Sequence, residues 1–105
     1  MVLAKTEVFN RLDVRLADIA KAISHPARIQ ILRILNEADR CIVGEMVEIL
    51  PLSQSTVSQH LKELKRVGLI KGEIEGPRVC YCLNQQVVSE VKQAFSELFS
   101  TFKCC

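Results

Sequence analysis

One segment near the middle of the sequence most constrains what this chain can fold into. Ser53, a residue type that caps helix N-termini, precedes apolar residues that recur at three- and four-residue spacing. Gly68 follows, where a glycine commonly ends a helix. Two stretches that read as strands then flank a Gly-Pro pair. We therefore expect a helix over about 54–67 and a β-hairpin over about 69–83.

The rest of the sequence predicts further helices. Apolar stripes indicate a first helix over about 5–23 and a last helix over about 85–102. A second helix begins after Pro26, and a third, short helix covers about 41–50. The predicted fold class is mainly α with a small β-hairpin (α+β), a single domain over residues 1–105. The stripe of the last helix is broad and aromatic, so we expect the first and last helices of two chains to pack into a homodimer.

The order of short helix, turn, second helix and hairpin is that of a winged helix-turn-helix. In this motif the second helix lies in the major groove with its N-terminal residues at the base edges. Glutamine amides and serine or threonine hydroxyls contact bases, and basic side chains contact phosphates. The candidate DNA-contacting residues are Gln54, Ser55, Thr56, Ser58, Gln59, His60, Lys62 and Arg78, with Lys65, Arg66 and Lys71 as further phosphate contacts. The expected partner is double-stranded operator DNA.

Composition narrows the class of protein. The 105 residues carry a formal net charge of only +2, so a DNA-binding surface must come from local arrangement rather than overall basicity. No apolar run is long enough to span a membrane, and the N-terminus lacks the pattern of a secretory signal. We therefore expect a cytoplasmic protein without a membrane partner.

The five cysteines are the second notable feature, and an odd number argues against a closed disulfide framework. Cys80 and Cys82 alternate with Tyr81 on the second predicted strand, so their side chains share one face. Cys104 and Cys105 end the chain. Thiolates favour soft ions, which makes Cys80, Cys82, Cys104 and Cys105 the candidate metal ligands. Cys41, alone at a predicted helix start, is a weaker candidate.

Three segments carry a family resemblance: HPAR at 25–28, LSQSTVSQHLK at 52–62 and GLI at 68–70. They resemble the ArsR/SmtB family of metal-responsive transcriptional repressors, and the resemblance covers roughly 16–102. It implies a winged-helix homodimer that binds an operator near its own promoter and leaves it when an inducer binds. It also implies that Gln54, Ser55, Ser58 and Gln59 are the main DNA-contacting positions.

The inducer sites of the family do not carry over. The arsenic-type site needs a Cys-Val-Cys run, and the matching stretch here is Ile42-Val43-Gly44-Glu45. The zinc-type site needs Asp and His ligands on the last helix, which contains neither. We therefore expect no permanently bound cofactor and an inducer held by the cysteines of the hairpin and the tail. Three sulfurs suit arsenic(III) or antimony(III), and four suit zinc or cadmium.

Alternatives remain open at this point. The main one is a thiol redox or persulfide sensor of the same fold, in which two cysteines become cross-linked. An enzyme with Cys80 or Cys41 as nucleophile and His60 as base is disfavoured, because no acidic residue or oxyanion loop nearby would orient the pair. A dimeric module without DNA leaves the polar run 54–60 unexplained.

Overall fold

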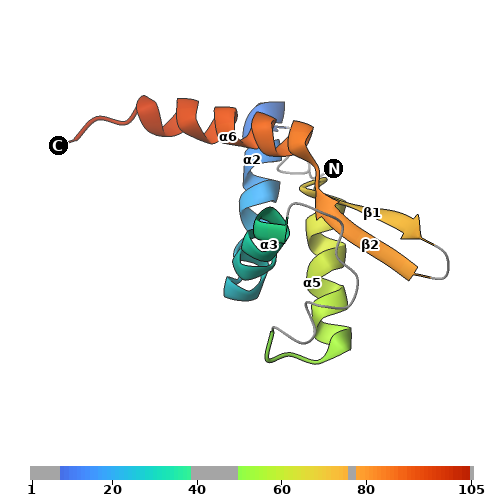
Figure 1. Ribbon diagram of the computed structural model, residues 1–105. Helices are drawn as coiled ribbons and strands as arrows, with labels where there is room; N and C mark the ends of the chain where they lie inside the picture. Colours follow the sequence, from blue (N-terminus) through green and yellow to red (C-terminus); the bar gives the residue numbers. More distant parts are fainter. Residues whose placement is uncertain (1–7, 39–49, 76–77, 105) are drawn as a thin grey trace, which may run out of the picture.

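The computed structural model describes residues 8–38, 50–75 and 78–104, with side chains outside 73–79. Four helices and two strands follow in the order α2 (Arg11–Ala22), α3 (Pro26–Ala38), α5 (Gln54–Arg66), β1 (Ile70–Glu75), β2 (Arg78–Leu83) and α6 (Gln85–Ser100). The predicted short helix over 41–50 lies almost wholly outside the described residues. Figure 1 shows the hairpin projecting to one side of the helices, while α6 crosses the end of α2 and carries the C-terminus to the other side. The predicted fold class, a mainly helical chain with a small hairpin, is confirmed.

Side chains define where the first two described helices begin. Asn10 caps α2, and its Oδ1 accepts a hydrogen bond from the Leu12 amide at 2.8 Å. α2 therefore begins at Arg11, because Asn10 has non-helical backbone angles. The predicted helix start, 5–7, lies outside the described residues. The imidazole of His25 plays the same part before α3, where Nδ1 accepts from the Ala27 amide at 3.0 Å.

The turn chemistry around α5 matches the sequence prediction. Ser53 has extended backbone angles, and its Oγ accepts from the Thr56 amide at 3.3 Å. At the other end Gly68 has φ +87°, a left-handed conformation that glycine adopts without a steric penalty. β1 begins two residues later, at Ile70, so only a few residues join α5 to the hairpin.

The two strands form an antiparallel pair in which Ile70 lies opposite Leu83 and Glu75 opposite Arg78. Asn84 follows β2 and caps α6, its Oδ1 accepting from the Val87 amide at 3.4 Å. α6 ends at Ser100, two residues before the predicted end, and the Thr101 hydroxyl donates to the Leu98 carbonyl at 2.8 Å.

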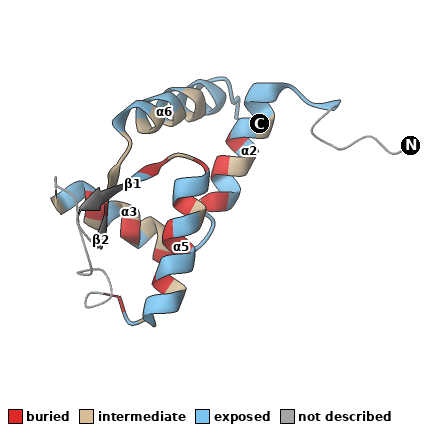
Figure 2. Ribbon diagram, turned by 90° about the vertical axis from the view of Figure 1, so that its right-hand side faces the viewer, coloured by how far each residue is buried: buried red, intermediate tan, exposed pale blue. Residues whose placement is uncertain are grey.

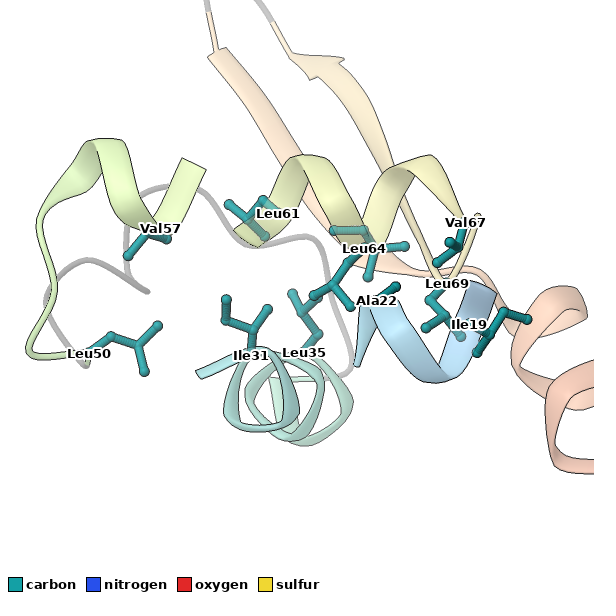
Figure 3. Packing of buried hydrophobic residues seen from close by; sticks show 11 residues of the cluster. Ile19, Ala22, Ile31, Leu35, Leu50, Val57, Leu61, Leu64, Val67 and Leu69 are labelled. Carbon is teal, nitrogen blue, oxygen red and sulfur yellow. The ribbon is translucent and has the colours of Figure 1, made fainter. Parts of the chain in front are cut away.

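The core gathers apolar side chains from α2, α3, α5 and the start of β1 (Figure 3). Its largest fully buried side chains are Ile19, Ile31, Leu64, Val67 and Ile70. Burying each of these side chains contributes about 1.5–3 kcal/mol relative to leaving it in water. Leu64, with the buried Val57 and Leu61, holds α5 against α3, so the core sets which face of α5 points outward.

α6 differs from the other helices, because none of its residues is fully buried (Figure 2). Val87, Val88 and Val91 in its first half, and Phe95 beyond them, pack against the core. In its second half, Leu98 is 40% exposed and Phe99 is 61% exposed. Among the described residues, no helix is long and apolar enough to cross a membrane.

Candidate functional site

The faces of α5 differ sharply in polarity. Its polar N-terminal residues lie in solvent, and its apolar residues face α3 and the hairpin. The exposed positions are Gln54, Ser55, Ser58, Gln59 and Lys62. The buried positions are Val57, His60, Leu61 and Leu64. An exposed row of amides and hydroxyls at the start of a helix has the chemistry needed to contact base edges in a major groove.

The first turn of α5 is held by hydroxyl contacts. Besides capping the helix, Ser53 Oγ donates to Thr56 Oγ1 at 2.9 Å and lies 3.2 Å from Ser55 Oγ. Thr56 is half-buried, and its hydroxyl accepts this hydrogen bond from the capping Ser53. Gln54 and Ser58 are exposed, and within the described part of the chain their side chains make no such hydrogen bond.

His60 requires a correction to the predicted DNA surface. The sequence analysis placed it among the DNA-contacting residues, but it is only 7% exposed and faces α3. Arg28 Nε donates to His60 Nδ1 at 3.0 Å, and the rings of His25 and His60 lie 4.5 Å apart. The physical reason is helical period: His60 lies three residues after Val57 and four before Leu64, on the buried face.

The surroundings of His60 favour its neutral form. Burial lowers the pKa of the imidazole below 6.5, and positive charge on His25 and Arg28 lowers this pKa further. Arg28 also donates from Nη1 to the carbonyl of Ala22 at 3.0 Å. Its guanidinium therefore joins the end of α2, the start of α3 and the middle of α5.

Arg66, expected to contact phosphate, is held by carboxylates instead. Its two terminal nitrogens donate to the Asp18 carboxylate of α2 at 2.9 and 3.0 Å, and its Nε donates to Glu63 at 3.2 Å. The bonds from Arg66 lower the pKa of both carboxyl groups. Lys62 and Lys65 are also exposed, and in the described part of the chain neither is paired with a carboxylate.

The hairpin supplies the remaining predicted contacts. Lys71 on β1 is exposed. Arg78 begins β2 opposite Glu75, at the tip of the hairpin, and its side chain lies outside the described residues. The prediction that Arg78 contacts DNA therefore stays a prediction, supported only by the position of its backbone.

The cysteines do not share one environment. Cys80 is 3% exposed and is disulfide-bonded, whereas Cys82 is a half-buried free thiol and Cys104 an exposed free thiol. Cys41 and Cys105 lie outside the described residues. Tyr81 and Leu83 pack against the core, as the strand alternation predicts, but Cys80 on the other face is buried as well.

Within one chain, α6 separates the hairpin cysteines from the tail. Cys82 lies just before this helix and Cys104 just after it. The 16 residues of α6 span about 24 Å at 1.5 Å per residue. Figure 1 shows the hairpin and the C-terminus on opposite sides of the helices. Among the described residues, no group of three His, Cys, Asp or Glu side chains is placed to hold a metal ion. Cys105 lies outside the described residues, so the four-cysteine site stays a prediction.

Two residues of the site, Arg28 and Asp18, escaped the sequence analysis as partners of α5. Their contacts join residues 32 and 48 positions apart, and neither local spacing nor periodicity reports such pairs. For Arg28 a signal existed, because the HPAR segment that contains it was already part of the family resemblance.

Comparison with known proteins places this geometry in context. The family described as bacterial regulatory protein, arsR family, matches residues 25–71. The HTH-type transcriptional repressor SmtB of Mycobacterium tuberculosis is 44% identical over 66 residues, covering 63% of this chain and 48% of that protein. The chain thus spans about half the length of this relative.

Two further similarities extend over more of the aligned proteins. The HTH-type transcriptional regulator YgaV of Escherichia coli is 35% identical over 75 residues, covering 71% of this chain and 76% of YgaV. The solved structure of reduced HlyU from Vibrio cholerae superposes with a TM-score of 0.65 at 32% identity, covering 84% of this chain and 92% of HlyU. SmtB is named a transcriptional repressor and YgaV a transcriptional regulator.

Proposed function

Because the chain belongs to the ArsR family of bacterial transcriptional regulators, we propose that it is a repressor that binds operator DNA through α5. It dissociates from the operator when its cysteine thiols bind an inducer or are oxidised. The observation that carries the DNA-binding part is the two-faced α5. Gln54, Ser55, Ser58 and Gln59 are all exposed along its first two turns, above a buried apolar face. This arrangement presents the helix start to a major groove while the core holds the helix rigidly.

A gel-shift series tests this part. Gln54→Ala and Ser58→Ala each remove an exposed side chain of α5, and a lost base contact costs about 1–3 kcal/mol, or roughly 5- to 150-fold in affinity. Gln93→Ala, at an exposed position of α6, is the matched control. Wild-type affinity in both α5 variants would contradict the assignment of this face.

We further propose that the DNA-binding unit is a homodimer built on α2 and α6. Exposed aromatic and aliphatic side chains cluster near the N-terminal end of α2 and the C-terminal end of α6: Val8, Phe9, Leu12, Leu98, Phe99 and Phe102. Phe9, Val14 and Ala17 also line a cavity of about 830 Å³ beside α2. A second copy of the chain would cover these surfaces and give the two recognition helices that a palindromic operator requires.

For the inducer we propose arsenite or antimonite, bound by thiolates of the hairpin and the tail, with zinc or cadmium as further soft ions. Because α6 keeps Cys82 and Cys104 of one chain apart, the site would join Cys82 of one protomer to the tail of its partner. Three thiols would displace the three hydroxides of arsenous acid, forming three As–S bonds and releasing three waters without a change of oxidation state. Cys80 would take part only after reduction of its disulfide.

Operator release by arsenite tests this site. Cys82→Ser and Cys104→Ser should keep operator binding and lose the arsenite response, because each removes a thiolate outside α5. Ser89→Ala is the matched control, since it removes an exposed hydroxyl of α6 outside the proposed ligand set. A normal response in both test variants contradicts the proposed ligand set.

One observation favours a second candidate, a redox or persulfide sensor. Cys80 is disulfide-bonded within a buried part of β2, and the structural neighbour HlyU was solved in a reduced form. Peroxide would oxidise two thiols to one disulfide and be reduced to water. Operator release by peroxide that Cys80→Ser abolishes, with arsenite inactive, would select this candidate. Release by arsenite alone would select the first.

A further inference from the structure

The cluster of His25, Arg28 and His60 is not used by either proposed thiol site or by the DNA-contacting face. It lies where three helices meet. Arg28 Nη1 binds the carbonyl of Ala22 at the end of α2, and Arg28 Nε binds His60 in the middle of α5. His25 caps the start of α3, and its ring is tilted against the His60 ring with the two centroids 4.5 Å apart. A recognition helix is thereby attached to two other helices through one guanidinium.

The contact requires a particular protonation state. The Arg28 guanidinium can only donate hydrogen bonds, so His60 Nδ1 must accept and cannot carry a proton. A second proton on His60 would remove this acceptor and place a cation beside Arg28 and His25. Burial and these two neighbours lower the pKa of His60, which agrees with the neutral form that the geometry needs.

We propose that Arg28 and His60 are positioning residues of the recognition helix, and that operator binding requires neutral His60. The proposal rests on the proposed function, because it assumes that α5 contacts the operator. Protonation at acidic pH breaks the Arg28–His60 contact and repels α5 from the start of α3. The exposed polar face of α5 then no longer has the orientation that fits the groove.

Several other charged groups lie near His60, and a pH experiment on His60 must account for them. His25 precedes α3, Arg28 belongs to α3, and Glu63 on α5 acts on Arg28. β1 also packs on α5 but adds no charged group to those acting on His60 within the described part of the chain. His25 is the other histidine in contact with His60, and it therefore needs its own control.

The sign of the pH effect distinguishes this role from an ordinary histidine contact with DNA. A histidine that faces phosphate gains a charge on protonation, so acid strengthens its binding. Here acid weakens operator binding, by up to about tenfold per protomer for each pH unit below the His60 pKa.

The experiment measures affinity for the duplex that the full-length wild-type protein selects from a random-sequence DNA library at about pH 7.5. His60→Gln keeps an acceptor for Arg28 and cannot titrate, so we expect near wild-type affinity at about pH 7.5 and a flat profile toward acid. His60→Leu removes the acceptor and should bind weakly at every pH while remaining folded by circular dichroism. His25→Asn keeps the helix cap and should retain the acid loss, with its midpoint moved to higher pH.

Two outcomes overturn the proposal. One is an acid loss that persists unchanged in His60→Gln, and the other is wild-type affinity of folded His60→Leu at about pH 7.5. Failure of the DNA-binding function looks different, because the wild-type protein would then select no duplex at any pH. If His60→Leu fails to fold, Arg28→Met provides the second test, because methionine cannot donate a hydrogen bond to His60. This variant should show the same weak, pH-independent binding.

Discussion

At the scale of single residues, the basic side chains near the end of α5 differ in what surrounds them. Arg66 is held by Asp18 and Glu63, and these contacts raise the pKa of its guanidinium further above neutral pH. Lys62 is exposed. A cation already neutralised by two carboxylates releases few counterions from DNA, so equal formal charge does not mean equal contribution to operator binding.

This difference predicts distinct salt dependences. Lys62→Ala should weaken operator binding and reduce the slope of log affinity against log salt by about one. Arg66→Ala should change that slope by less than about half as much. Fluorescence anisotropy titrations over a range of salt concentrations measure both slopes, with Gln93→Ala as the reference. Equal slopes for the two variants would show that Arg66 leaves its carboxylates to contact phosphate.

A second residue-scale prediction concerns stability rather than DNA. The unfolded His60 has the ordinary pKa of 6.5, and the folded value is lower. Acid therefore protonates the unfolded chain first, so the contribution of His60 to the free energy of unfolding is complete above about pH 6.5 and is lost as the pH falls toward the folded pKa. Urea titrations at several pH values should show a smaller acid loss in His60→Gln than in the wild type. An identical loss in both proteins would place the titrating group elsewhere.

At the scale of elements, both ends of α5 are set by residues whose roles can be predicted from the sequence. Ser53 and Gly68 act through their own backbone and the next turn, so their roles can be read locally. The exposure of each residue of α5 also follows from helical period, and the misplacement of His60 came from grouping residues by polarity instead of by face. The partners of Arg28 and Arg66 depend on how helices pack, which no local pattern contains.

The left-handed conformation of Gly68 gives a prediction at this scale. A Cβ at this position would meet Val87 Cγ2 at 3.5 Å, an ordinary contact, so space is available and only the backbone angle resists substitution. Gly68→Ala should lower the free energy of unfolding by about 1–2 kcal/mol. Gly68→Asn should cost less, because asparagine tolerates positive φ. Equal costs for the two variants would indicate a packing effect instead.

At the scale of the whole molecule, the distribution of apolar surface is uneven. Phe99 contacts Phe95 and Phe102 along α6 in stacked and edge-to-face geometry, at ring centroid distances of 6.4 and 5.3 Å. Phe99 and Phe102 nevertheless remain about 60% exposed. Such a contiguous aromatic surface is typical of an interface in a soluble protein. An excess of apolar surface on the last helix could be predicted from the sequence, because its apolar stripe is wider than one small domain can cover.

The proposed dimer makes this surface testable. Phe99→Asp places a charge on the exposed aromatic row and should raise the dimer dissociation constant at least about 30-fold, the effect of losing a hot-spot residue. Ser96→Asp adds the same charge at an exposed polar position of α6 and should leave the constant nearly unchanged. Sedimentation equilibrium measures both. Dimers of equal stability in the two variants would exclude this face as the interface.

The half-covered α6 also has a consequence for gene dosage. In the proposed dimer, two chains must pair through α6 before they bind the operator. At low expression the dimer concentration therefore rises with the square of the protein concentration. Operator occupancy then responds steeply to how much protein the cell makes. A repressor that controls its own synthesis through such a helix would switch between sparse and saturated occupancy over a narrow range of expression.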